Sequence, residues 1–197
     1  EINEYPETLD KSNDKAINIL FVGRIARVRR IEILLQAVAK LSIPFHVTLV
    51  GGEEKTSSLS KWGYIDELKK LCKTLNITDR ITFIGPVIQS KLSNWYRKAD
   101  IFVYPSLYEN FGQPILEAAA VGLPVISTPV GVAKEIITDD ETGFLINGEH
   151  QELADRITQL ANNDLRLKIG NALREKVRNL YGWQGIIDQY MDVYKSL

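Results

Sequence analysis

A single cysteine, Cys72, occurs in the 197 residues of this sequence. One cysteine excludes an intrachain disulfide framework and cannot by itself form a zinc cluster. Cys72 falls at an apolar helical position, which favours a small core residue over a nucleophile. The two histidines, His46 and His150, have no partner at metal-ligand spacing. We therefore interpret both histidines as structural or solvated residues.

The sequence also lacks a strong net charge and a long apolar run. Its formal net charge is -1 and its pI is about 6.2, which gives no overall attraction to nucleic acid or to anionic membranes. No apolar run approaches the ~20 residues that a membrane span requires, so we expect no transmembrane segment. No signal-like leader opens the chain. We expect a soluble, cytoplasmic globular protein.

Two other classes of protein are disfavoured by the segment after the first apolar run. This segment, RIARVRR, carries four arginines in seven residues and could form a nucleic-acid-binding patch. However, the chain is nearly neutral and no aromatic residues are interleaved there, so we expect no nucleic acid as a partner. The same region, VGRIARV, lacks the G-x-G-x-x-G glycines of a dinucleotide-dependent dehydrogenase.

Apolar runs of strand length alternate with stretches of helical periodicity. We expect strands at 17–22, 45–50, 81–84, 101–104, 124–127 and 143–146. Between them we expect helices at 30–41, from Trp62 to Leu75, at 91–99, after Pro114 and through Glu135, with a helical region from 151 onward. Strands buried on both faces and separated by helices predict an α/β, Rossmann-like, doubly wound parallel sheet of about six strands. The polar residues 1–15 are typical of a linker or tail.

In such a sheet, ligands bind beyond the carboxyl ends of the strands. That edge includes the stretch YENFGQPILEAAAVGLPV, in which Pro114 fits the first position of a helix. The free amides of this helix end point back toward Gly112 and Gln113, and such an end attracts an anion. A nucleotide phosphate is the ligand that we expect there.

Two glutamates flank this helix end. Glu109 precedes the glycine turn, and Glu117 lies about one turn inside an otherwise apolar helix. A carboxylate can accept hydrogen bonds from both hydroxyls of a vicinal diol, at roughly 1.5–3 kcal/mol each. A nucleoside diphosphate sugar has such hydroxyls on both sides of its diphosphate. The alternative is that Glu109 is solvated and Glu117 only caps or salt-bridges its helix.

The block PSLYENFGQPILEAAAVGLPVISTPVG resembles the signature of the family 4 retaining glycosyltransferases, which have the two-domain GT-B architecture. Glu109 and Glu117 match its Glu-x7-Glu spacing. The segments FVGRIARVRRIEILLQA and ITFIGPV resemble the Gly-Arg segment and the base-binding loop of that family, and YGWQGIIDQYMDVYKSL resembles its closing helices. The resemblance covers the chain from about residue 17 to its end.

The resemblance implies a role for each matching residue. Glu109 would contact the donor sugar and Glu117 the ribose, while Arg24 and Arg29 would neutralise the diphosphate. These roles give the expected catalytic set of Glu109, Arg24 and Arg29, and the expected donor-binding set of Gly23, Gly85, Val87, Asn110, Phe111, Gly112, Gln113 and Glu117. The family generally works without a bound metal, so we expect no metal and no cofactor.

At three positions the sequence departs from the family pattern. Arg29 stands where a lysine is usual, although an arginine can bind a diphosphate bidentately. Arg30 follows where a glycine is usual, and Val132 replaces the second glycine of a double-glycine turn. Because Arg30 and Val132 are bulkier than glycine, the loops that carry them can differ in shape from those of the family pattern.

The chain resembles only the second domain of this architecture. We therefore expect residues 16–197 to be a donor-binding domain for a UDP-, GDP- or ADP-sugar, with the acceptor site on a missing N-terminal domain. Such a fragment alone should be inactive, and its full-length parent would be cytoplasmic or peripheral at the membrane. A non-catalytic nucleotide-sugar-binding module and a GT-B epimerase or phosphorylase are the alternatives.

Overall fold

The computed structural model describes residues 16–53 and 63–196. Its centre is a six-stranded sheet in the order β3-β2-β1-β4-β5-β6, and every neighbouring pair is parallel. The strands are β1 (Ile17–Val22), β2 (Phe45–Val50), β3 (Ile81–Gly85), β4 (Ile101–Tyr104), β5 (Val125–Ser127) and β6 (Phe144–Leu145). The predicted Rossmann-like parallel sheet of about six strands is therefore confirmed.

The burial of the strands follows their place in the sheet. β4 is buried along its whole length, and β1 at all but one of its residues, because helices cover both faces of the central strands. β3 is the edge strand beyond β2, and each of its five residues is only half-buried. β1 and β2 pair without a shift from Ile17↔Phe45 to Val22↔Val50, so their carboxyl ends finish level with each other.

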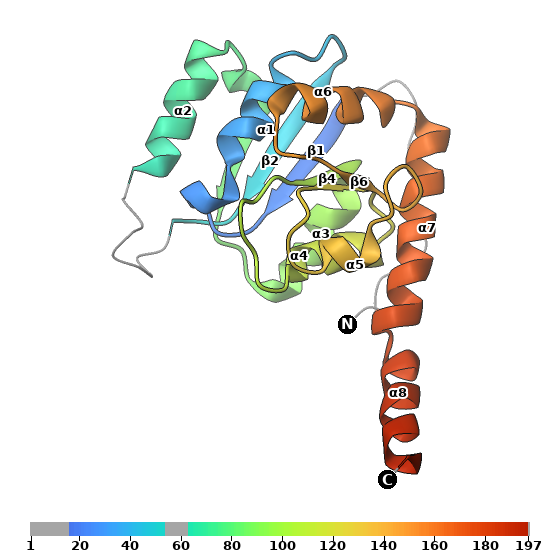
Figure 1. Ribbon diagram of the computed structural model, residues 1–197. Helices are drawn as coiled ribbons and strands as arrows, with labels where there is room; N and C mark the ends of the chain where they lie inside the picture. The colour runs from blue at the N-terminus through green and yellow to red at the C-terminus, as the bar shows by residue number, and fades with distance from the viewer. Residues whose placement is uncertain (1–15, 54–62, 197) are drawn as a thin grey trace.

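The connecting elements are η2 (Arg27–Arg29), α1 (Ile31–Val38), α2 (Tyr64–Thr74), η3 (Thr78–Arg80), α3 (Gln89–Lys98), α4 (Gln113–Ala120) and α5 (Ala133–Ile136). Right-handed crossovers place α1 and α2 on one face of the sheet and α3, α4 and α5 on the other. Figure 1 shows this separation, with α6 (His150–Gln159) packed beside α1. The long α7 (Asn163–Tyr181) packs against α4.

The region after 151 is divided into separate helices. α6 ends at Gln159, and Asn162 caps α7, since its side-chain oxygen accepts from the Leu165 N–H at 3.0 Å. Gly182, in an extended conformation, separates α7 from α8 (Trp183–Lys195). α8 extends away from the sheet in Figure 1, and none of its residues is buried. No helix within the described part of the chain is long and apolar enough to cross a membrane.

The boundaries differ from the predicted ones at a few places. The first helix begins at Ile31 and not at Arg30, because Arg30 has a φ of 51°, in the left-handed region. The last two strands are shorter than predicted, at Val125–Ser127 and Phe144–Leu145. The predicted linker 1–15 and the predicted helical residue Trp62 lie outside the described residues.

Candidate functional site at the carboxyl edge of the sheet

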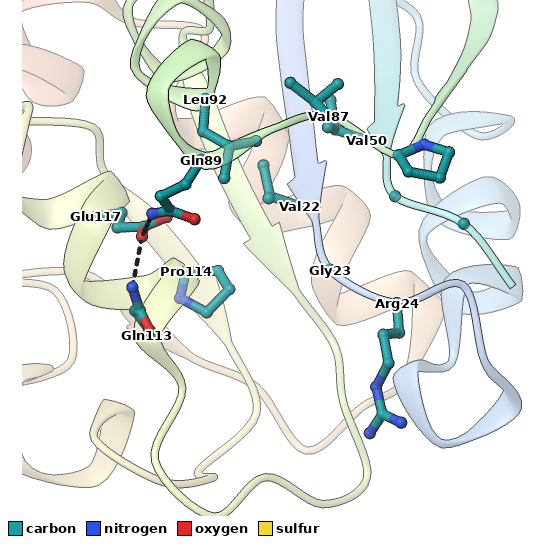
Figure 2. Close-up of a pocket in the computed structure, with 13 residues that line it drawn as sticks. Val22, Gly23, Arg24, Val50, Val87, Gln89, Leu92, Gln113, Pro114 and Glu117 are labelled. Carbon is teal, nitrogen blue, oxygen red and sulfur yellow. Dashed lines mark hydrogen bonds between the residues drawn. The ribbon is translucent and has the colours of Figure 1, made fainter. Parts of the chain in front are cut away.

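A cavity of about 290 Å³ lies at the carboxyl ends of the first three strands. Its walls come from the ends of β1 and β2, from the β3–α3 connection and from the start of α4, as Figure 2 shows. The lining residues are Val22, Gly23, Arg24, Val50, Gly51, Gly52, Pro86, Val87, Gln89, Leu92, Gln113, Pro114 and Glu117. Valine, leucine and proline side chains form the apolar part, and Arg24 and Glu117 supply opposite charges.

The glycines at this edge allow neighbouring strand ends to come close together. The Gly23 N–H donates to the Val50 carbonyl at 3.0 Å, and the Gly51 N–H donates to the Gly85 carbonyl at 2.9 Å. A Cβ on Gly51 would lie 1.8 Å from the Gly23 carbonyl oxygen, so only glycine fits at position 51. Backbone groups, not side chains, therefore form this wall of the cavity.

Glu117 is held by three hydrogen-bond donors. Its Oε2 accepts from the Tyr96 hydroxyl at 2.7 Å. Its Oε1 accepts from the side-chain amides of Gln89 at 2.6 Å and Gln113 at 2.9 Å. Gln89, Gln113 and Glu117 lie together on one side of the cavity in Figure 2, and Arg24 lies on the other. Glu117 therefore faces the cavity from inside α4, and it forms no salt bridge with another residue in the described part of the chain.

Glu109 lies in a second group of contacts, next to the α4 end. Its Oε2 accepts from the Tyr104 hydroxyl at 2.7 Å and lies 2.6 Å from Arg29 Nη1. Its Oε1 accepts from the Asn110 N–H at 3.0 Å. Burial by itself raises the pKa of the Glu109 carboxyl, but the hydrogen bond from Tyr104, the charge of Arg29 and the Asn110 N–H together lower it below its ordinary value.

Arg29 fixes the loop that carries Glu109. This arginine is buried, at 7% exposure. Besides Glu109, its Nη1 donates to the Ser106 hydroxyl at 3.1 Å and to the Tyr108 carbonyl at 3.0 Å. Its guanidinium also lies 5.4 Å from the centre of the Tyr104 ring. Arg29 thus joins the β1–α1 segment to the β4–α4 loop, and it is not among the residues that line the cavity.

The other arginines of the segment RIARVRR have different surroundings. Arg27 pairs with Glu67 of α2 at 2.5 Å. Arg30 donates to the Gly148 carbonyl at 2.9 Å, and a Cβ on Gly148 would lie 2.4 Å from its Nη1. Arg24 is exposed on the cavity wall. The four arginines of this segment therefore differ in their partners and in their exposure.

The start of α4 separates the two glutamates. Gly112 is the residue before the helix and has a φ of 89°, which favours glycine. A Cβ at Gly112 would lie 3.5 Å from Glu109 Cγ, so the turn passes directly beside that glutamate. The Phe111 carbonyl accepts from the Val132 N–H at 2.7 Å, which ties the β5–α5 turn to this loop. Val132, where the family pattern has a glycine, therefore contributes its backbone to the loop.

The structure thus divides the predicted site residues between two neighbouring groups. Gly23, Arg24, Val87, Gln113 and Glu117 line the cavity. Glu109, Asn110, Phe111 and Gly112 lie in the adjoining β4–α4 loop, Arg29 contacts that loop from η2, and the Gly85 carbonyl accepts from the Gly51 N–H. Sequence reasoning missed Gln89, Tyr96 and Tyr104. Both tyrosines lie at core positions of a helix or strand, where nothing in the sequence distinguishes a packed ring from a hydrogen-bond donor.

Metal-ligating side chains do not gather in the described part of the chain. In residues 16–53 and 63–196 there is no group of three or more His, Cys, Asp or Glu side chains that could hold a metal ion. The carboxylates of the site, Glu109 and Glu117, instead have tyrosine, amide or guanidinium partners.

The strand order and the position of the cavity define a Rossmann-like α/β domain with a ligand site at the carboxyl edge of its sheet. The chain belongs to the glycosyl transferases group 1 family, whose model matches residues 4–179. A D-inositol 3-phosphate glycosyltransferase from Streptomyces coelicolor is 33% identical over 186 residues, which are 90% of this chain and 40% of that protein. The chain thus spans less than half the length of this curated relative.

Solved structures show the same fold. Sucrose-phosphate synthase from Thermosynechococcus elongatus has a TM-score of 0.82 and 29% identity, over 99% of this chain and 50% of that chain. The C-terminal domain of a group 1 glycosyl transferase from Francisella tularensis has a TM-score of 0.76 and 28% identity, over 92% and 90% of the two chains. Anabaena HepE, solved with UDP and glucose, has a TM-score of 0.80 at 24% identity, over 94% and 50%.

Proposed function

We propose that residues 16–197 form the donor-binding domain of a retaining glycosyltransferase that takes a nucleoside diphosphate sugar. The observation that carries this proposal is the arrangement of Glu109 and Glu117 on either side of the α4 end. Glu117 faces a cavity with apolar walls, and Glu109 lies in the loop just beyond it. A ligand with a diol at each end and negative charge in its middle fits this order of groups.

The cavity suits the nucleoside half of the donor. Its apolar walls, which include Val22, Val87 and Leu92, can cover the faces of a base. The backbone at Gly85 and Val87 can hydrogen-bond to the edge of the base. A carboxylate offers about four lone-pair sites, and three of those of Glu117 are taken, so Glu117 can accept from one ribose hydroxyl directly and from the second when a glutamine amide is displaced. Because HepE was solved with UDP, this nucleotide is the first one to test.

The diphosphate would lie between the two glutamates. The amides at Gly112 and Gln113 belong to the end of α4, where the helix dipole favours negative charge. Arg24, exposed on the cavity wall, adds a full positive charge. Arg29 pairs with Glu109 and does not line the cavity. It would therefore act on the diphosphate through its charge at a distance, or by leaving Glu109 to contact the phosphate directly. We assign the phosphate-binding role to Arg24 first and to Arg29 second.

These groups can also promote the reaction. When the glycosidic bond of the donor breaks, negative charge accumulates on the leaving diphosphate. Donors and cations fixed in advance at that oxygen stabilise the transition state. Glu109 would orient the transferred sugar, and its lowered pKa keeps it ionised and able to accept hydrogen bonds at neutral pH. We assign no covalent nucleophile.

The acceptor site belongs, in this proposal, to a further domain. The chain covers 40% of the Streptomyces relative and 50% of the sucrose-phosphate synthase chain, and each of these proteins has further sequence that this chain does not match. α8, with its exposed aromatic residues, would pack on that domain. The name of the relative makes D-inositol 3-phosphate one acceptor to include in an assay. Product analysis of the full-length protein separates a transferase from a binding module, an epimerase and a phosphorylase.

Titration calorimetry with UDP, GDP and ADP tests donor binding directly. One of these nucleotides should bind to the chain, and Glu117→Gln should weaken it about tenfold or more, which corresponds to one charged hydrogen bond. Glu67→Gln is the matched control, since Glu67 pairs with Arg27 outside the cavity. If none of the three nucleotides binds, or if both variants behave alike, the proposed site is wrong.

A further inference from the structure

Each glutamate of the Glu-x7-Glu pair has a tyrosine hydroxyl at the same distance. Tyr96, from α3, donates to Glu117 Oε2 at 2.7 Å. Tyr104, the last residue of β4, donates to Glu109 Oε2 at 2.7 Å. The two carboxylates therefore have the same kind of partner. The two tyrosines come from different elements, and the two glutamates lie in different parts of the site.

Both tyrosine rings belong to the core and not to the site. Tyr96 is fully buried and Tyr104 is 1% exposed. Phe102 lies between them, with its ring centre 5.8 Å from that of Tyr96 and 6.0 Å from that of Tyr104. Phe21 stacks on the other side of Tyr104 at 5.6 Å. A row of packed aromatic rings thus fixes where both hydroxyls lie, because buried side chains at core density keep one rotamer.

The tyrosine hydroxyls engage one oxygen of each carboxylate, and exposed residues bond to the other oxygen. Oε1 of Glu117 accepts from the side-chain amides of Gln89 and Gln113, and both glutamines are exposed. Oε1 of Glu109 accepts from the Asn110 N–H, which is also exposed. In each glutamate, one oxygen is therefore bonded to a buried tyrosine, and the other oxygen is bonded to groups of exposed residues.

The protonation states suit this arrangement. Burial and the hydrogen bond with Glu109 raise the pKa of Tyr104, so its hydroxyl retains its proton and remains a donor. The same hydrogen bond lowers the pKa of Glu109. A protonated phenol and an ionised carboxylate form a charge-assisted hydrogen bond, which is stronger and more directional than a neutral one.

We propose that Tyr96 and Tyr104 are positioning residues, which hold Glu117 and Glu109 in the orientation that the donor substrate requires. This inference rests on the proposed function, because it takes the two carboxylates to be the groups that bind ribose and sugar. A flexible glutamate loses rotamer freedom when it binds a ligand. A hydroxyl fixed by the core removes that freedom beforehand, so the ligand binds more tightly.

The two tyrosines should affect different parts of the donor. Tyr96→Phe should weaken uridine and UDP equally, by about tenfold, because both contain the ribose that Glu117 would bind. It should leave inorganic pyrophosphate binding unchanged. Tyr104→Phe should leave UDP within about twofold and remove the additional affinity that UDP-glucose gains from its sugar. GDP or ADP and their glucose conjugates replace the uridine series if they bind more tightly to the wild type.

A matched control exists in the same chain. Tyr64 is also buried, and its hydroxyl donates to a glutamate, Glu32, in a groove outside the cavity. Tyr64→Phe removes an equivalent hydroxyl, so it should change stability without changing the affinity for any of these ligands. A double variant tests whether Tyr96 acts through Glu117. If it does, adding Tyr96→Phe to Glu117→Gln should lower the affinity for UDP by less than about twofold compared with Glu117→Gln alone.

One measurement does not depend on any nucleotide. In a carbon-13 NMR titration of the chain, Tyr104→Phe should raise the pKa of Glu109, and Tyr64→Phe should not change it. If the wild type binds no nucleotide but this pKa rises, the proposed function fails and the coupling of Tyr104 to Glu109 stands. If the wild type binds and Tyr96→Phe and Tyr104→Phe weaken all ligands no more than Tyr64→Phe does, the positioning role is overturned.

Discussion

Arg29 Nη1 lies 2.6 Å from Glu109 Oε2, and the two side chains are 9% and 17% exposed. Their positions are far apart in the sequence, on the β1–α1 segment and on the β4–α4 loop. Arg29 is buried and Glu109 is half-buried, so the pair is costly to break, because removing Glu109 leaves the Arg29 charge buried without this partner. The pair therefore contributes to the stability of the loop that carries Glu109 as well as to the charge of the site.

Glu109→Gln should lower the free energy of unfolding by about 1–3 kcal/mol at pH 7, since the buried Arg29 loses a counter-charge that solvent screens in part. The folded-state pKa of Glu109 is lower than its unfolded value of about 4.3, so this contribution is present above pH 4.3 and is lost as the pH falls through the folded-state pKa. Urea unfolding at several pH values should show the two proteins converging as the pH falls from about 4.3 through the folded-state pKa of Glu109.

Glu175→Gln is the control for this experiment. Glu175 pairs with Arg178 at 3.5 Å on an exposed part of α7, with side-chain exposures of 66% and 44%. Exposed pairs of this type contribute about 0–1 kcal/mol, so the substitution should have little effect at any pH. A difference between wild type and Glu109→Gln that stays constant from pH 7 to pH 3 would contradict the assignment of the pair as buried and ionised.

Arg24→Ala should weaken UDP about 10- to 100-fold, because a charged hydrogen bond to a phosphate contributes ~1.5–3 kcal/mol. Uridine binding should change by less than about twofold, since uridine has no phosphate for Arg24 to contact. Rising salt should weaken UDP binding to the wild type more than to the variant, because salt screens the charge of Arg24. Calorimetry at several salt concentrations measures this difference.

Arg27→Ala is the matched control for Arg24→Ala. Arg27 lies on the same segment, but its guanidinium pairs with Glu67 at 2.5 Å and does not line the cavity. Equal losses from the two substitutions, or equal losses of UDP and uridine in Arg24→Ala, would show that Arg24 does not bind the diphosphate. Arg29→Ala is a poorer test, because it also breaks the buried pair with Glu109.

Gly51→Ala should destabilise the fold by about 3–5 kcal/mol, because its Cβ would lie 1.8 Å from the Gly23 carbonyl and its φ is 137°. Gly85→Ala separates the two causes. Gly85 has a φ of 81° but no atom within 4 Å of the added Cβ, so its cost should be only about 1–2 kcal/mol. Urea unfolding of both variants gives the comparison. Equal losses would mean that backbone strain, and not the contact with Gly23, explains the glycine at position 51.

The parallel sheet could be predicted from the sequence because each central strand is a short apolar run followed by glycine or proline. The neighbourhood of Glu109 and Glu117 could be predicted because both lie within one loop and one helix. The partners of these residues could not be predicted. Arg29 meets Glu109 only after β1 and β4 pair side by side, and Tyr96 reaches Glu117 only through the packing of α3 on α4.

Helix and strand boundaries were less predictable for local reasons. Arg30 looks like the first residue of a helix in the sequence, yet it adopts a φ of 51°, and its side chain reaches the Gly148 carbonyl. The contact with Gly148, 118 positions away, explains how an arginine is held at a position whose backbone favours glycine. Long-range contacts of this kind are not visible in local periodicity.

The last prediction concerns transfer of the sugar. Because the chain matches only part of the length of its relatives, we expect it to bind a donor but to show little transfer or hydrolysis alone. Transfer requires the acceptor hydroxyl to be aligned with the anomeric carbon, and alignment supplies a large part of the rate. Closure around both substrates also excludes water, which competes as an acceptor.

A steady-state assay with a labelled nucleotide sugar compares this chain with a protein that also carries an N-terminal acceptor domain. The larger protein should transfer the sugar, and Glu109→Ala in it should reduce the rate by at least about 100-fold, because Glu109 would orient the reacting sugar. Glu175→Ala, on the exposed surface of α7, should leave the rate unchanged. Efficient transfer by the 197 residues alone would contradict the assignment of this chain as the donor-binding part, because no second domain would then be required to place the acceptor.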